Sequence, residues 1–277
     1  MGDLEDDTAV ERVGDGRYRA HVSADWALVG PVGGYLASIA LRAAGAHASL
    51  PRPASISCQY LSRARFDAVD IEVVDRHTSR SAQSLAVEVT QHGRLVLTAQ
   101  VWAVAEGIAG PEHRLSHPPP VPPPEQMAEI VLDPAVANRI ATTATATGRF
   151  WRNLELRWVA DHSRPEGLQI HSWVKFRPRA YFKDPWVDAC REVISIDTGI
   201  LPAVAWALPG GARFVAPSID LYVAFHEPPP PEDYLLVTAR GTAAGAGLLS
   251  GTAETRSLDG TLRASGGSQL LCRMLQA

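Results

Sequence analysis

The chain has 277 residues, 46% of them hydrophobic, and carries 26 Lys and Arg against 30 Asp and Glu. This length and composition are typical of a globular protein with one large core or two smaller ones. The slightly acidic balance, without a basic run, argues against nucleic acid as a partner.

The N-terminal segment, residues 1–14, is acidic and lacks the hydrophobic core of a secretory signal. No stretch approaches the roughly 18 uninterrupted apolar residues that a membrane span requires. Cys58, Cys190 and Cys272 are odd in number and widely spaced, which fits neither a disulfide framework nor a zinc site. We therefore interpret them as small buried residues and expect a cytoplasmic protein.

The first half of the chain predicts one buried helix and a set of strands. A short strand entered through the Gly-Asp-Gly turn is expected over residues 14–22, and a segment that is apolar nearly all round predicts a helix over 33–46. Partly alternating segments then predict four strands, with a hairpin at His92-Gly93: 55–61, 69–74, 84–90 and 95–104. A long sheet that curls round one helix is the simplest architecture for this order.

Residues 117–125 (HPPPVPPPE) predict a stiff, extended connector, because proline lacks the backbone donor and fixes its own φ. A linking helix is expected over 134–146. We therefore divide the chain into an N-terminal unit at 1–116, a connector with its helix at 117–150, and a C-terminal unit at 151–277.

The second half repeats the order of elements. A second central helix is predicted over 187–208, interrupted at Pro202. The expected strands, with a hairpin at residues 258–260, are 154–159, 168–176, 217–225, 234–240, 248–255 and 262–274.

Landmarks in the two halves recur at matching spacings, which predicts a tandem duplication. Gly34 precedes Ser57 by 57−34=23 positions, and Asp197 precedes Asp220 by 220−197=23. Likewise, Gly93 precedes Val101 by eight positions, and Gly260 precedes Ser268 by eight.

Four segments resemble the acyl-CoA thioesterase II family: GPVGGYLASIALRAA, VTQHGRLVLTAQVWAV, PSIDLYVAFHEP and LDGTLRASGGSQLLCR. The resemblance spans nearly the whole chain and implies an α+β tandem (double) hotdog, in which each repeat is an antiparallel sheet wrapped around a central helix. It further implies hydrolysis of acyl-CoA as substrate, with neither a cofactor nor a covalent intermediate. The family also suggests a homodimer, although two hotdogs in one chain make a monomer feasible.

The family's catalytic Asp, Thr and Gln position a water molecule. The resemblance places the Asp on Asp220 and the Thr on Thr242, whereas the Gln position is occupied by Ser268, with Gln269 one residue later. Strand side chains alternate, so Ser268 and Gln269 should point to opposite faces unless a bulge at Gly266-Gly267 intervenes. Either residue remains a candidate for the role of the Gln.

The chemistry of a thioester also fits a sparse site. Its thiolate leaving group, with a pKa of about 8.5 by analogy with cysteine, needs little acid assistance. A carboxylate can take a proton from water, and the N–H groups of Gly33 and Gly34 at a helix start can bind the substrate's developing oxyanion. Both glycines also suit close packing of helix and sheet. Asp197 is interpreted first as a helix-turn or N-terminal capping acid.

One site per chain is expected, because Ser57 stands where Asp220 stands in the second half.

Two alternatives remain open: a non-catalytic module that binds acyl-CoA or an acyl carrier, and a hotdog hydratase or dehydratase. The latter would need an acid and a His together, but Asp220 and His226 would lie roughly 20 Å apart on a straight strand. No G-x-S-x-G elbow, dinucleotide fingerprint, HExxH or Walker motif is present.

Overall fold

The computed structural model describes residues 1–111, 117–130, 148–161, 169–208, 214–226 and 231–274. Within these ranges, twelve antiparallel strands form one continuous, curled sheet in the order β1-β2-β4-β5-β6-β3-β10-β13-β12-β11-β8-β7. The predicted linking helix over 134–146 lies outside the described residues.

The first half contributes α1 (Leu4–Asp7), the short helix η1 (Ala24–Trp26), α2 (Gly33–His47) and six strands. These strands are β1 (Glu11–Gly14), β2 (Arg17–His21), β3 (Arg52–Tyr60), β4 (Ala68–Thr78), β5 (Ala82–Gln91) and β6 (Arg94–Val104). The sheet wraps around α2, and this helix is buried on nearly all sides, as its composition predicts.

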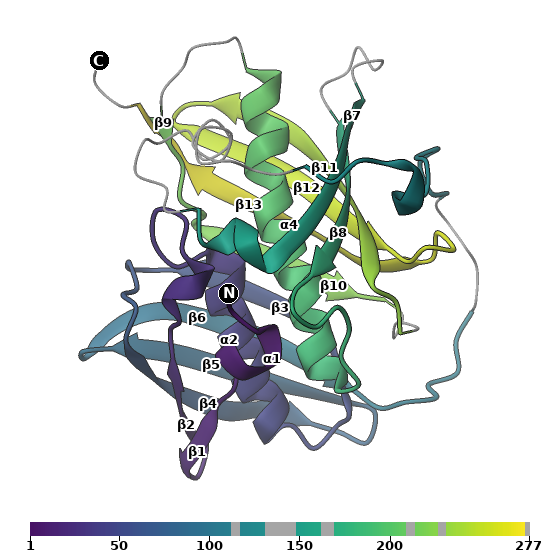
Figure 1. The fold of residues 1–277 in the computed structure, drawn as a ribbon. Coiled ribbons are helices and arrows are strands. Elements are labelled where there is room, and N and C mark those ends of the chain that lie inside the picture. Colours follow the sequence, from purple (N-terminus) through teal and green to yellow (C-terminus); the bar gives the residue numbers. More distant parts are fainter. Residues whose placement is uncertain (112–116, 131–147, 162–168, 209–213, 227–230, 275–277) are drawn as a thin grey trace.

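The second half contributes η3 (Phe150–Asn153), α4 (Pro185–Ala207) and the remaining strands. The strands are β7 (Leu154–Asp161), β8 (Gln169–Phe176), β10 (Asp220–Phe225), β11 (Tyr234–Gly245), β12 (Leu248–Arg256) and β13 (Leu262–Leu271), with a separate pair made of β9 (Phe214–Val215) and β14 (Arg273–Met274). Figure 1 shows α4 next to α2 in the middle of the molecule, enclosed by the strands. None of the helices in the described ranges is long and apolar enough to cross a membrane.

Strands β3 and β10 pair with each other and join the two halves of the sheet. In this ladder Cys58 pairs with Leu221, Gln59 with Asp220 and Ser57 with Tyr222. An offset of 163 residues makes Ser57, Cys58 and Gln59 the counterparts of Asp220, Leu221 and Tyr222, because 220−57, 221−58 and 222−59 all equal 163. Cys58 pairs with its own counterpart, whereas Ser57 pairs with the counterpart of Gln59 and Gln59 with the counterpart of Ser57. The pairing is therefore symmetrical about the Cys58–Leu221 pair.

The predicted architecture, an antiparallel sheet wrapped around a central helix in each half, is confirmed, but two of the predicted strands have different bounds. The strand expected over residues 14–22 is β2, entered as predicted through the Gly-Asp-Gly turn, where Gly16 adopts φ +60°. Strand 262–274 is divided into β13 and β14, and strand 217–225 begins as a regular strand only at Asp220.

The expected interruption of the second central helix at Pro202 does not occur. Helix α4 runs unbroken through this residue to Ala207. Pro202 removes one backbone donor from the helix, but the helix on both sides of it is packed against the sheet. Ile200 lies against Gly251 of β12, and Val204 lies against Gly241 of β11. These contacts hold the helix together across the proline.

The Pro-rich connector does lack helix and strand over residues 117–123, and the short helix η2 (Pro124–Gln126) follows it. Trp173 of β8 donates its indole N–H to the carbonyl of Pro122 at 2.9 Å. The connector is therefore fixed against the outside of the second half.

A buried network of charges fastens α4 to β13. The Arg263 guanidinium contacts Asp188 at 2.7 Å and Glu192 at 2.5 Å, and Arg191 contacts Asp188 at 3.1 Å. All four side chains are at most 4% exposed. Arg191 also donates to the carbonyl of Glu232 at 3.0 Å. Each buried charge thus has an opposite charge beside it, as burial of ions requires.

Candidate active site

Asp220 lies at the start of β10, beside the junction of the two halves. The regular ladder between β10 and β13 begins only at the Tyr222–Gly267 pair, so the two strands are not regularly paired at Asp220. Oδ1 of Asp220 instead accepts the backbone N–H of Gln269 at 2.7 Å. The side chain is half-buried, and none of the described residues donates a hydrogen bond to Oδ2.

Ser268 and Gln269 lie on opposite faces of β13, as alternation predicts. The buried Ser268 donates its hydroxyl to the Asp220 carbonyl at 2.7 Å, whereas the side chain of Gln269 is exposed. The pairing of β12 with β13 is regular from Gly266 to Gln269, so the bulge that the two glycines would allow does not form there. Both residues border Asp220, one through its side chain and the other through its backbone.

Thr242 is not brought to Asp220. It lies at an irregularity of β11 between Gly241 and Ala243, and its exposed hydroxyl lies 3.0 Å from the hydroxyl of Ser250. Ser250 in turn pairs with Gln269, so β12 and β13 separate Thr242 from Asp220. Three strand spacings amount to about 14 Å.

Gly33 and Gly34 begin α2, and the Gly34 N–H is already engaged. It donates to Oδ2 of Asp197 at 2.7 Å, while the Ser218 hydroxyl donates to Oδ1 of Asp197 at 3.0 Å. Asp197 is 8% exposed. Burial raises the pKa of Asp197, and its two hydrogen bonds offset part of that rise.

Asp197 therefore is a capping acid, but not for its own helix. It lies in the middle of α4 and accepts a donor from the start of α2, where the N-cap residue Val32 provides no side-chain acceptor. A carboxylate in this position is also favoured by the dipole of α2. Because Asp197 and Ser218 touch, the start of α2 is connected to the segment that leads into Asp220.

Tyr60, the last residue of β3, completes this cluster. Its backbone N–H donates to the carbonyl of Ile219 at 3.0 Å, next to Asp220. Its hydroxyl is buried and has no hydrogen-bond partner among the described residues. Burial, together with the negative charges of Asp197 and Asp220, raises the pKa of Tyr60, so the side chain is neutral and can donate a proton. Sequence reasoning did not identify this residue.

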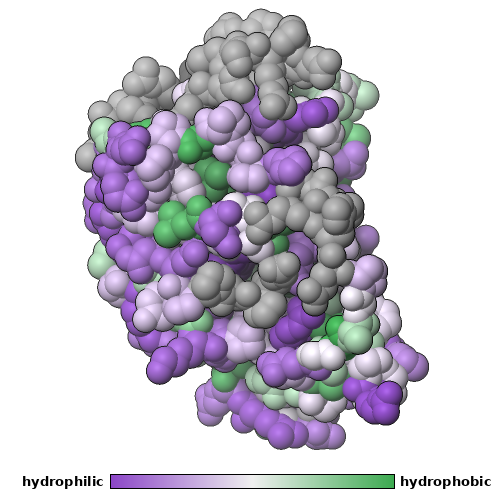
Figure 2. Space-filling model, turned by 90° about the vertical axis from the view of Figure 1, so that its right-hand side faces the viewer, coloured by the Kyte–Doolittle hydropathy of each residue, from purple (hydrophilic) through white to green (hydrophobic). Residues whose placement is uncertain are grey.

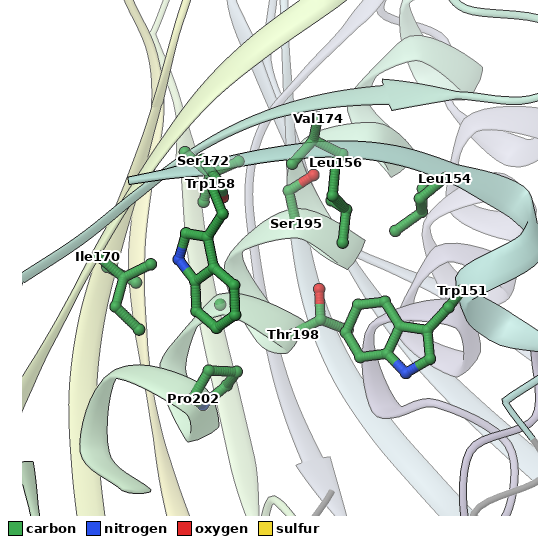
Figure 3. Close-up of a pocket in the computed structure, with 13 residues that line it drawn as sticks. Trp151, Leu154, Leu156, Trp158, Ile170, Ser172, Val174, Ser195, Thr198 and Pro202 are labelled. Atoms are coloured by element: carbon green, nitrogen blue, oxygen red, sulfur yellow. The ribbon is translucent and has the colours of Figure 1, made fainter. Parts of the chain in front are cut away.

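An apolar pocket lies on the side of α4 that faces β7 and β8. Its cavity volume is about 50 Å³, and it opens to solvent. Figure 3 shows Trp151 of η3 and Trp158 of β7 on either side of Thr198, with Val174 and Leu156 nearby. On the one face drawn in Figure 2, the coloured residues are mostly polar, and the hydrophobic ones form small separate groups.

Comparison with known families identifies both halves. Residues 22–104 match the model of the acyl-CoA thioesterase N-terminal domain, and residues 118–270 match that of the acyl-CoA thioesterase C-terminal domain. The chain belongs to the acyl-CoA thioesterase family. It is an enzyme that hydrolyses acyl-CoA thioesters, and the alternative of a non-catalytic binding module is thereby disfavoured.

Solved structures show that this acyl-CoA thioesterase has the hotdog fold. A conserved hotdog protein of unknown function from Alicyclobacillus acidocaldarius is 23% identical with a TM-score of 0.81, and covers 100% of both chains. The acyl-CoA thioesterase II TesB2 of Mycobacterium marinum is 17% identical with a TM-score of 0.81, and covers 99% of both chains. At these identities the likeness shows the fold alone. No curated protein matches the chain.

Two other groups of residues do not offer a catalytic alternative in this thioesterase. Burial raises the pKa of the Cys190 thiol to about 12 and also raises that of Cys58, so neither is a ready nucleophile. Cys272 is half-buried rather than buried as expected.

His226 follows the far end of β10, where it lies 2.9 Å from the hydroxyl of Ser265. Six residues of extended chain, about 20 Å, separate it from Asp220, so the two do not form the acid–His pair that a dehydratase would need.

Replacement of Gly34 by Ala is expected to loosen the contact between the central helices. An added Cβ would lie 2.8 Å from Cα of Ile194 and 3.0 Å from the carbonyl oxygen of Val193, both of α4. We expect a loss of about 1–3 kcal/mol in the free energy of unfolding, measured by urea denaturation. Gly110→Ala is the control, because its Cβ would meet nothing within 4 Å. Equal stability of the two variants would contradict this interpretation of the helix contact.

Proposed function

We propose that Asp220 activates the water that hydrolyses the thioester. The observation that carries this proposal is the state of its carboxylate, which is half-buried and fixed at Oδ1 by the Gln269 N–H, with Oδ2 free of described donors. A fixed carboxylate with one unengaged oxygen can accept a proton from a water molecule in a defined position.

The reaction then needs no cofactor. The water oxygen bonds to the thioester carbonyl carbon while its proton moves to Oδ2 of Asp220, and a tetrahedral oxyanion forms. The oxyanion collapses, the carbon–sulfur bond breaks, and CoA leaves as a thiolate whose conjugate acid has a pKa of about 8.5 by analogy with cysteine. The proton on Asp220 passes to the thiolate or to solvent, and the carboxylate is restored.

Ser268 and Gln269 are proposed to divide the role of the family Gln. The Ser268 hydroxyl is bonded to the Asp220 carbonyl, so it orients the backbone of the catalytic residue. The exposed side chain of Gln269 extends from the strand position next to Asp220 and can donate to the attacking water. Thr242 is proposed only as the outer end of a polar row that runs through Ser250 to Gln269.

Release of the CoA thiol from a panel of acyl-CoAs tests this function. We expect turnover by the wild type on at least one chain length. Saturable binding of acyl-CoA without turnover at any chain length would favour the binding module and overturn the proposal.

The apolar pocket between α4 and β7–β8 is proposed to hold the end of the acyl chain. Its walls are mostly aliphatic and indole side chains, with the hydroxyl residues Ser172, Ser195 and Thr198 among them, and no charged residue is among the described residues that line it. An uncharged hydrocarbon chain therefore fits it, whereas the CoA nucleotide does not.

The variant Leu156→Trp is expected to shorten the acceptable acyl chain, because the larger side chain fills pocket space. We expect the ratio of kcat/KM for dodecanoyl-CoA to that for butanoyl-CoA to fall about tenfold or more, given about 0.8 kcal/mol per buried methylene. Leu61→Trp, at a position that is 52% exposed and outside the pocket, is the control. An unchanged ratio in Leu156→Trp would place the acyl chain elsewhere.

We further infer that the two halves arose as an internal repeat with an offset of 163 residues, divided at 1–116, 117–150 and 151–277, and that the chain carries one site. The symmetrical pairing of β3 with β10 supports the offset.

Gly33 and Gly34 are proposed to lie beside the bound thioester. The homodimer and the cytoplasmic location stay predictions, which light scattering and cell fractionation can check.

A further inference from the structure

The buried hydroxyl of Tyr60 is the starting point. A buried polar group without a partner costs about 1–3 kcal/mol in proteins, so such a group in a native structure requires an explanation. The residue as a whole is half-buried, but its hydroxyl oxygen is fully buried and has no partner among the described residues. An added Cβ on Gly33 would lie 3.2 Å from it and equally 3.2 Å from Oδ2 of Asp197. The hydroxyl thus lies at the first turn of α2, within the candidate site.

Hydrolysis of a thioester requires a hydrogen-bond donor for the oxyanion, and the Gly34 N–H does not supply it while it is bonded to Asp197. Attack by water converts the carbonyl oxygen into an oxyanion, which needs at least one positioned hydrogen-bond donor. The Gly34 N–H, the expected donor, is bonded to Asp197 at 2.7 Å. The Tyr60 hydroxyl lies at the same helix start and retains its proton for donation.

We propose that the Tyr60 hydroxyl donates a hydrogen bond to the thioester carbonyl oxygen and stabilises the oxyanion formed when water attacks. This inference rests on the proposed function and adds a catalytic residue to it. The hydroxyl oxygen is buried in the chain without substrate, so this contact requires neighbouring side chains to move apart when the thioester binds. The hydroxyl donates while it stays neutral.

The neighbouring carboxylates are arranged in a way that is compatible with this role. Each oxygen of Asp197 accepts one hydrogen bond, from the Gly34 N–H or from the Ser218 hydroxyl, and the Tyr60 hydroxyl donates to neither of them. Asp220 enters β10 one residue after Ile219, whose carbonyl accepts the Tyr60 N–H. The proposed base and the proposed oxyanion donor therefore lie on adjacent, directly bonded strands.

Tyr60→Phe tests the proposal, because it removes only the hydroxyl. We expect kcat to fall about 100-fold or more with KM within about twofold of the wild type, as for loss of an oxyanion donor. The midpoint of thermal unfolding should not fall, because no described partner loses a hydrogen bond. Wild-type kcat in Tyr60→Phe would overturn the role of Tyr60.

Tyr35→Phe is the matched control. Tyr35 is also buried, but its hydroxyl donates to the Asp7 carbonyl at 2.7 Å and accepts the Ser23 N–H at 3.0 Å. We therefore expect the opposite pattern, a midpoint lowered by a few degrees with kcat retained. Loss of kcat in both variants to the same degree would indicate a general structural effect and would overturn the proposal.

A binding measurement gives a second readout. A trifluoromethyl ketone analogue of acyl-CoA, which presents an oxyanion-like oxygen, should bind Tyr60→Phe more weakly by about the factor lost in kcat/KM, while the affinity for CoA itself is unchanged. Unchanged affinity for the ketone would contradict the donor role. The proposed function fails separately, if wild-type enzyme releases no CoA or if Asp220→Asn turns over normally, whatever Tyr60→Phe shows.

Discussion

Replacement of Asp220 by Asn is expected to lower kcat for acyl-CoA hydrolysis by about 100- to 10,000-fold, the range attributed to general base catalysis. Asn retains the size of the side chain and an oxygen that can accept the Gln269 N–H, which Asp220 accepts at 2.7 Å. It cannot take a proton from water. The rate of CoA thiol release measures the effect, and binding of CoA should be retained.

Ser57→Ala is the control for this variant. Ser57 occupies the position in the first half that corresponds to Asp220 by the offset of 163, and it pairs with Tyr222 across the junction. We expect its kcat to stay within about threefold of the wild type, because loss of an exposed hydroxyl leaves no buried group unpaired. A loss as large as that of Asp220→Asn would show that the proposed asymmetry of the two halves is wrong.

The largest loss of stability is expected from Arg263→Met. Its guanidinium neutralises Asp188 and Glu192, which lie 2.7 and 2.5 Å away and are 2% and 4% exposed. Without Arg263, only Arg191 remains beside the two carboxylates, and one negative charge stays buried without a counter-charge. Removal of one partner of a buried ion pair costs about 3–5 kcal/mol, so we expect a loss of that size in the free energy of unfolding.

Arg19→Met is the matched control, because Arg19 also pairs with an Asp, at 2.8 Å to Asp70, but both side chains are more than half exposed. An exposed ion pair contributes at most about 1 kcal/mol. Urea denaturation of both variants gives the comparison. If the two variants lose the same free energy, the buried network does not carry the stability assigned to it.

The central helices and most strands could be predicted from local patterns. Helix α2 is apolar on nearly every side, and strands in both halves alternate, so their sequences indicate their environment directly. The unbroken course of α4 through Pro202 could not be predicted in this way. It depends on contacts with Gly241 and Gly251, which are close to α4 only in the folded chain.

The candidate site was only partly predictable for a similar reason. Asp220 was found through a short segment that resembles a family, and its neighbours Ser268 and Gln269 were assigned to opposite faces by alternation. The bond between Asp197 and Gly34 joins residues that are 163 positions apart. The unpaired hydroxyl of Tyr60 is equally invisible in the sequence, because a lack of partners is a property of the packed structure.

Single-turnover hydrolysis in water enriched in oxygen-18 tests the role of Asp220 most directly. If Asp220 activates water, the released fatty acid carries one heavy oxygen after a single turnover, and the protein carries none. If the carboxylate instead attacked the thioester itself and water then opened the acyl-enzyme at the Asp220 carbonyl, the heavy oxygen would appear in Asp220 and the first acid released would be unlabelled. That second result would contradict the proposed mechanism.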